Sequence, residues 1–110
     1  MNLAALRRAI LDLAVDDYTG LWEVLWLLQG IVRDTSEQTT TLGRRLVSEM
    51  MKDGSLQLYL GRSFTGDEHQ VLGDDRNRLL ESDTYWNEPL AEYPHLRVVA
   101  TEQGEREYMH

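Results

Sequence analysis

Two short clusters of polar residues in the second half of the chain have the composition of metal sites. Asp67-Glu68-His69 offers oxygen and nitrogen ligands, but adjacent residues rarely converge on one ion, and no His-Glu-x-x-His spacing accompanies them. Gly73-Asp74-Asp75 contains a carboxylate pair of the kind used with magnesium, but it lacks phosphate-cradling glycines and has the composition of a helix cap. We therefore expect a solvated loop and a helix cap, with no bound metal and no cofactor.

The residue patterns that mark many enzymes are missing from the sequence. The chain has no cysteine, which excludes disulfides, thiolate zinc sites, iron–sulfur clusters and cysteine nucleophiles. His95 precedes an apolar run and His110 is the last residue, and the sequence places no acid or nucleophile beside either to form a relay. There is no Gly-x-Ser-x-Gly elbow, no P-loop and no Gly-x-Gly-x-x-Gly motif. We expect a protein that is not an enzyme.

Tryptophans and carboxylates are the more informative groups. Trp22 and Trp26 are one helical turn apart, and the first expectation is that the segment 61–94 covers one of them. A ring left exposed would instead anchor a partner or a second copy of the chain. The acidic run 67–92 is either a solubilising loop or a docking surface for a basic partner. The candidate protein-binding residues are Trp22, Trp26, Asp74, Asp75, Glu81, Asp83 and Trp86.

Apolar spacing predicts three helices in the first half of the chain. Residues 3–15 carry leucine and isoleucine at intervals of three, four and three, and residues 21–29 are apolar over more than half of the helix surface. Gly30 then offers a left-handed stop. A capping-box spacing at 34–37 begins a third helix that runs to Lys52, although its three threonines and Gly43 favour a separate first turn.

The second half of the chain contains two strand patterns separated by a long acidic stretch. Residues 55–61 alternate leucine with polar residues, and residues 96–100 are rich in β-branched residues. We expect an extended loop over 61–94, interrupted by a short helix at 75–82, and a terminal helix over 101–108. The fold class is therefore α+β, with three N-terminal helices, a two-stranded antiparallel wing and a short C-terminal helix in one domain, 1–110.

This order of elements resembles the winged helix-turn-helix fold of MarR- and PadR-type regulators. The resemblance covers nearly the whole chain and is carried by the helix exit LVSEMMKDGSL at 46–56 and the return VVATEQGER at 98–106. It implies a third helix that enters the DNA major groove and a wing that touches phosphate. The matching positions are Thr39, Thr40, Thr41, Arg44, Arg45, Ser48, Lys52 and Arg62. The stretch 61–94 replaces the short hairpin of that family.

The charge distribution argues against binding to nucleic acid. The whole chain has a formal charge of −8. Residues 36–52 contain three basic and two acidic residues, whereas residues 67–95 contain two arginines and eight acids. An acidic wing beside a nearly neutral reading helix repels phosphate. Our first hypothesis is a non-enzymatic acidic binding protein that engages a basic protein, in a regulatory or immunity-type role. The alternative is a dimeric DNA-binding transcriptional regulator that uses the third helix.

Membrane and secretion signals are absent from the sequence as given. The longest strongly apolar stretch, 21–28, contains Glu23 and is much shorter than the roughly 20 residues that span a bilayer. Near the start, Arg7 and Arg8 lie within an amphipathic pattern, and no small-residue cleavage site follows. We expect a cytoplasmic protein whose partner is a basic protein or a second copy, and not a membrane.

Overall fold

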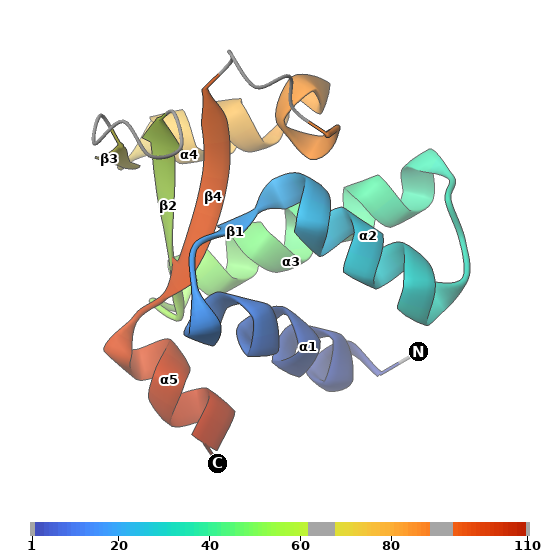
Figure 1. Ribbon diagram of the computed structural model, residues 1–110, viewed down its shortest axis with the longest axis horizontal. Helices are drawn as coiled ribbons and strands as arrows, with labels where there is room; N and C mark the ends of the chain where they lie inside the picture. Colours follow the sequence, from blue (N-terminus) through green and yellow to red (C-terminus); the bar gives the residue numbers. More distant parts are fainter. Residues whose placement is uncertain (1, 62–67, 89–93, 110) are drawn as a thin grey trace.

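The computed structural model describes residues 2–61, 68–88 and 94–109 (Figure 1). Over these residues the chain forms an α+β fold with five α-helices, a short 3-10 helix and a four-stranded antiparallel sheet, which confirms the expected class. The helices are α1 (Leu3–Asp16), α2 (Leu21–Val32), α3 (Glu37–Lys52), α4 (Asp74–Leu80), the 3-10 helix η1 (Asp83–Trp86) and α5 (Glu102–Met109). The strands are β1 (Thr19–Gly20), β2 (Leu56–Gly61), β3 (His69–Val71) and β4 (His95–Ala100).

The sheet is built around the two strands that the alternating apolar residues predict. β2 and β4 pair antiparallel, from Leu56 opposite Ala100 to Gly61 opposite His95. Two shorter strands flank this pair, in the order β1-β4-β2-β3, so the expectation of only two strands is wrong (Figure 1). β1 has two residues and β3 has three, which is too short for an alternating pattern to show in the sequence.

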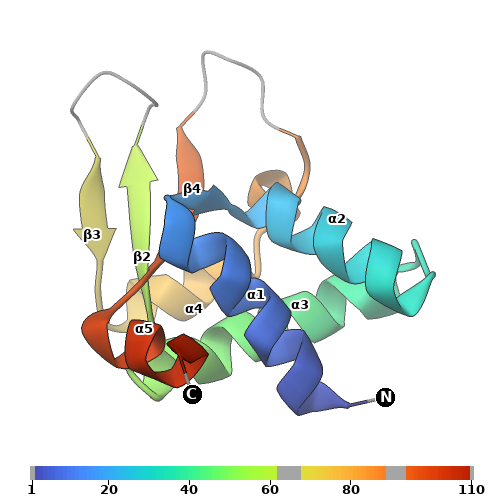
Figure 2. The same cartoon turned by 60° about the horizontal axis from the view of Figure 1, so that its bottom comes forward.

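One hydrophobic core joins the sheet to the helices. The first three helices contribute their apolar faces, and β2 and β4 contribute the side chains of one sheet face. Figure 2 shows α5 close to α1, and α2 packs against both α1 and α3. The buried apolar residues are Leu6, Ile10, Leu11, Ala14, Leu21, Val24, Leu25, Leu28, Leu46, Val47, Met50, Met51, Leu56, Leu58, Val71, Leu80, Trp86, Leu96 and Val98.

α2 is longer than the sequence pattern predicts. The helix continues through Gly30 to Val32 and ends at Arg33, whose φ of 56° lies in the left-handed region. Gly30 has no positive φ, so its role as a left-handed stop is wrong. The apolar residues Ile31 and Val32 extend the helix by two residues beyond that glycine.

α3 is one continuous helix, so the expected separate first turn is wrong. Ser36 caps the helix, because its hydroxyl oxygen accepts a hydrogen bond from the backbone N–H of Gln38 (3.3 Å). Thr39 supports this first turn by donating its hydroxyl to the backbone oxygen of Asp34 (3.0 Å). The local cap offsets the weak helix propensity of the three threonines.

The segment 61–94 was expected to be an extended loop with one short helix at 75–82, and it contains that helix, as α4, together with a further strand and a 3-10 helix. β3, α4 and η1 occupy most of 69–86, and α4 packs next to α3 (Figure 2). Leu80 and Trp86 anchor the segment, since both are buried and the Trp86 indole N–H donates to the backbone oxygen of Leu80 (2.7 Å). The ranges 62–67 and 89–93 lie outside the described residues.

Arg7 fastens the N-terminal helix to the C-terminal one. Its guanidinium donates to both carboxylate oxygens of Glu107 (2.6 and 2.8 Å), to Asp53 (2.7 Å) and to the hydroxyl of Ser55 (2.9 Å). These hydrogen bonds raise the pKa of Arg7 and lower the pKa of Glu107. We call this set of hydrogen bonds around Arg7 the clasp. It joins α1 to α5 and to the turn between α3 and β2.

Candidate protein-binding surfaces

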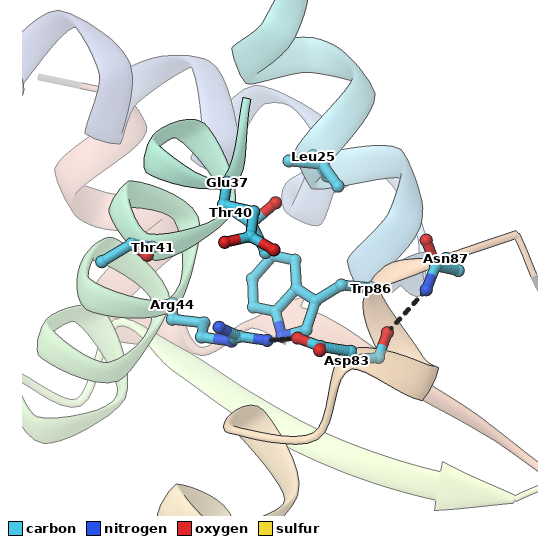
Figure 3. Close-up of a pocket in the computed structure, with 8 residues that line it drawn as sticks. All are labelled: Leu25, Glu37, Thr40, Thr41, Arg44, Asp83, Trp86 and Asn87. Carbon is cyan, nitrogen blue, oxygen red and sulfur yellow. Dashed lines mark hydrogen bonds and ion pairs between the residues drawn. The ribbon is translucent and has the colours of Figure 1, made fainter. Parts of the chain in front are cut away.

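The inserted segment is docked on the exposed side of α3. Arg44 Nε donates to the backbone oxygen of Leu80 (3.0 Å), and the same guanidinium forms an ion pair with Asp83 (Figure 3). These contacts border an open pocket of about 360 Å³. Its lining residues are Leu25, Glu37, Thr40, Thr41, Arg44, Asp83, Trp86 and Asn87. We call this region the insert junction.

Gly43 is the reason that a tryptophan fits at the insert junction. A Cβ atom at position 43 would lie 3.0 Å from the ring of Trp86 and 3.3 Å from the side chain of Leu28. Trp86 is 2% exposed, so its ring fills the space that the missing side chain leaves. Gly43 weakens the helix locally but permits this close packing.

The insert junction occupies several positions that the resemblance assigns to DNA contact. Arg44 is paired with Asp83, and Ser48 lies 3.4 Å from Asn77 of α4. Thr39 is buried and bound to Asp34, whose pKa is held below its usual value by hydrogen bonds from Ser36 and Thr39. Arg44, Ser48 and Thr39 therefore contact other parts of this chain.

The remaining candidate DNA-contact residues do not form a continuous basic face. Thr40 and Thr41 line the pocket of the insert junction. Arg45 is exposed and paired with Glu49 of the same helix (3.2 Å), while Lys52 is exposed at the end of α3. Arg62 lies outside the described residues.

The acidic candidates of the insert are spread over its surface. Asp74 and Asp75 occupy the first turn of α4, and Asp75 pairs with Arg78 (2.9 Å). Glu81 is exposed at the end of that helix, and Asp83 faces Arg44. Trp86, which was expected to bind a partner, is buried in the core.

The two tryptophans of α2 have different environments. The Trp22 ring lies over Gly20 and packs edge-on against His95, with 5.3 Å between the ring centroids. Trp26 is 51% exposed. The inserted segment therefore leaves Trp26 open, which is the case in which the sequence predicts an anchor for a partner or a second copy.

A second, more acidic hollow lies where α1, β1 and α2 meet the sheet. It is open and has a volume of about 760 Å³. Five of its nine lining residues are carboxylates and one is an arginine. The lining residues are Asp12, Leu13, Asp16, Asp17, Tyr18, Thr19, Glu23, Glu68 and Arg97. We call this hollow the acidic groove.

Local structure holds the carboxylates of the acidic groove in place. Asp12 and Asp16 lie one turn apart on α1, and Tyr108 of α5 donates its hydroxyl to Asp12, which raises the pKa of Tyr108. Glu23 accepts from the backbone N–H of Gly20 (3.3 Å) at the start of α2. These contacts leave the groove with a strongly negative, water-accessible lining.

Tyr18 adds an aromatic surface to the acidic groove. Its side chain is 43% exposed, and its ring packs edge-on against Tyr59 with 5.3 Å between centroids. A tyrosine fixed in this way can stack on an arginine or lysine side chain. In the sequence, the only local signal of the groove is the pair Asp12 and Asp16, which are four residues apart.

The groove is not arranged as a metal centre. Within the described ranges 2–61, 68–88 and 94–109, no three histidine, aspartate or glutamate residues are placed to hold one ion. None of the helices seen in those ranges has the length and apolar character needed to cross a bilayer.

No protein-family model, curated protein or solved structure matches this chain.

Proposed function

We propose that this protein is a non-enzymatic binding protein whose acidic groove engages a basic surface of another protein. The observation that carries the proposal is the convergence of five carboxylates and an exposed tyrosine on one open hollow. Carboxylates can accept paired hydrogen bonds from arginine, and Tyr18 offers a ring face to the same cation. The net charge of −8 would also speed encounter with a basic partner.

The scaffold that we propose is a winged helix with an insertion. β1 lies between α1 and α2 in the chain and pairs with β4, and α3 leads directly into the β2–β4 pair. α5 follows β4 at once. This order supports the family resemblance, with β3, α4 and η1 inserted between the two strands of the wing.

The insert junction favours protein binding over DNA binding. A reading helix must present cations to phosphate and to base edges. Here Arg44 faces Asp83 and the backbone of Leu80, and Arg45 faces Glu49. The two arginines of α3 therefore already have carboxylate partners, and among the α3 cations only Lys52, at its last position, lacks one in the described ranges. Both a regulator with a basic face and a nucleic-acid-directed toxin held by an immunity protein suit the acidic groove.

The proposal can be tested by titrating the protein with a polyarginine peptide at several salt concentrations. The double variant Asp16→Asn/Asp17→Asn removes two charges from the acidic groove. We expect it to weaken binding about tenfold, since each exposed charge pair contributes up to about 1 kcal/mol. Calorimetry or fluorescence anisotropy provides the measurement.

A matched control removes the same charge from the insert. Asp74→Asn/Glu81→Gln changes two exposed carboxylates of α4 and its end, outside the acidic groove. We expect this variant to bind almost as well as the original protein. An equal loss in both double variants would mean that net charge alone attracts the peptide, and the proposal would fail.

A further inference from the structure

Three glycines lie inside the described helices, and the fold explains two of them. Gly104 of α5 packs against the backbone of Ser55, because a Cβ atom there would overlap the Ser55 backbone oxygen. Gly43 of α3 gives its space to the ring of Trp86. Gly30 of α2 has no positive φ, and a Cβ atom there would meet nothing within 4 Å. Glycine weakens a helix interior relative to alanine. Neither the backbone nor the packing within the chain requires it at position 30.

Gly30 belongs to an exposed stripe on α2. Glu23, Trp26, Gly30 and Arg33 are all exposed, at intervals of three, four and three residues. This spacing places Glu23, Trp26 and Gly30 along one face of α2, as in the seam of a coiled coil, and Arg33 follows directly after the end of the helix. Trp26 is 51% exposed, so the stripe presents a large ring one turn away from an empty position. We call these four residues the α2 stripe.

We propose that the α2 stripe is the contact surface of a homodimer in which α2 of two copies packs antiparallel about a twofold axis. With the axis at the level of position 28, Trp26 of one copy lies against Gly30 of the second copy. The same axis places Glu23 of one copy opposite Arg33 of the second copy. Both pairings repeat by symmetry, which is the condition for a closed twofold contact.

Charge identifies a second copy as the occupant of the stripe. The chain carries −8 overall, so two copies repel each other over most of their surface. The stripe itself contains one acid and one base, at mirrored positions about the proposed axis. Within the described ranges, Arg33 has no carboxylate partner in its own chain. A second copy supplies one.

The proposal goes beyond the basic-partner function and is tested without any peptide. Sedimentation across a range of concentrations should show a reversible dimer of the original chain. Trp26→Ala and Gly30→Leu should each raise the dissociation constant by about thirtyfold, the effect of losing a central anchor or blocking its socket. Circular dichroism of both variants should show unchanged or higher helix content, because both positions are exposed.

Charge reversal tests the register of the contact. Glu23→Arg alone and Arg33→Glu alone each oppose like charges twice at the twofold contact, so each variant should dimerise more weakly than the original chain, by about fivefold or more. Mixed together, the two single variants pair arginine with glutamate at both contacts. They should form a mixed dimer in preference to either self-pair.

Three results would overturn the dimer. The original chain could remain monomeric at the highest concentration measured, Gly30→Leu could dimerise as well as the original chain, or the two charge variants could show no preference for each other. Any of these leaves the acidic-groove titration standing, because that experiment changes Asp16 and Asp17, which lie outside the α2 stripe. Glu23 belongs to both surfaces, so Glu23→Arg is used in the dimer experiment alone.

Discussion

The insert junction and the α2 stripe contain the same kinds of residue, which have partners within the chain at the insert junction and are exposed along the α2 stripe. Each has a tryptophan near a helix glycine, with an arginine and an acid beside them. At the insert junction the chain supplies every partner: Trp86 fills the space at Gly43, and Arg44 meets Asp83. Along the α2 stripe the ring, the space and the charges remain exposed. Surfaces available to partners are therefore those that the insertion leaves uncovered.

Replacing each tryptophan with alanine tests whether one ring is buried and the other exposed. Trp86→Ala should cost about 3–5 kcal/mol of unfolding free energy, because it empties a buried site and removes the hydrogen bond to Leu80. Trp26→Ala should change the unfolding free energy of the monomer by less than about 0.5 kcal/mol. Urea denaturation at low protein concentration measures both. Equal costs would show that the two rings are not in opposite environments.

Replacement by leucine should lower the unfolding free energy at Gly43 and raise it at Gly30. Gly43→Leu forces a side chain against Trp86 and should cost about 1–3 kcal/mol. Gly30→Leu enters open space in a helix and should stabilise the monomer by about 0.5–1 kcal/mol. Thermal melts of the two variants give the comparison, and a destabilised Gly30→Leu monomer would contradict the open face of α2.

The arginines of α3 provide a smaller test of the insert junction. Arg44→Ala should cost about 1 kcal/mol, since it removes one of the two hydrogen bonds to the backbone oxygen of Leu80 and the ion pair with Asp83. Arg45→Ala removes only an exposed pair with Glu49 and should cost about 0.3–0.5 kcal/mol. Chemical denaturation resolves the two. If Arg45→Ala costs as much as Arg44→Ala, the insertion does not depend on Arg44.

The smallest expected effect is a pH dependence at the clasp between Arg7 and Glu107. The hydrogen bonds from Arg7 lower the pKa of Glu107, so the folded state favours the ionised carboxylate. This contribution to stability is full above about pH 4.3, the ordinary pKa of glutamate, and is lost as the pH falls through the lowered value. Unfolding free energies of the original chain and Glu107→Gln should therefore converge in acid. A constant gap would contradict the lowered pKa.

Periodicity in the sequence predicts the elements whose repeating pattern is long enough to read. The heptad-like leucines of α1 and the alternating leucines of β2 are of this kind. β1 has two residues and gives no pattern. The insertion is acidic on average, and its fold depends on Leu80 and Trp86, whose partners lie on helices distant in the sequence. Composition alone does not identify such anchors.

The candidate sites were predicted less well than the elements, for a related reason. Arg44 and Asp83 were assigned to two competing functions, yet they bind each other across 39 positions. The acidic groove draws Asp16 from α1, Glu23 from α2 and Glu68 from just before β3, so only the fold brings its charge together. Local sequence shows which side chains are charged, while tertiary contacts decide which remain available.

The most direct test of the account is to map where a basic ligand touches the protein. Backbone amide chemical shifts of the isotopically labelled chain can be followed by NMR as polyarginine peptide is added. We expect the largest changes at residues 12–23 and at Glu68 and Arg97, around the acidic groove. Changes centred on the insert, 74–86, with the groove unaffected, would contradict it.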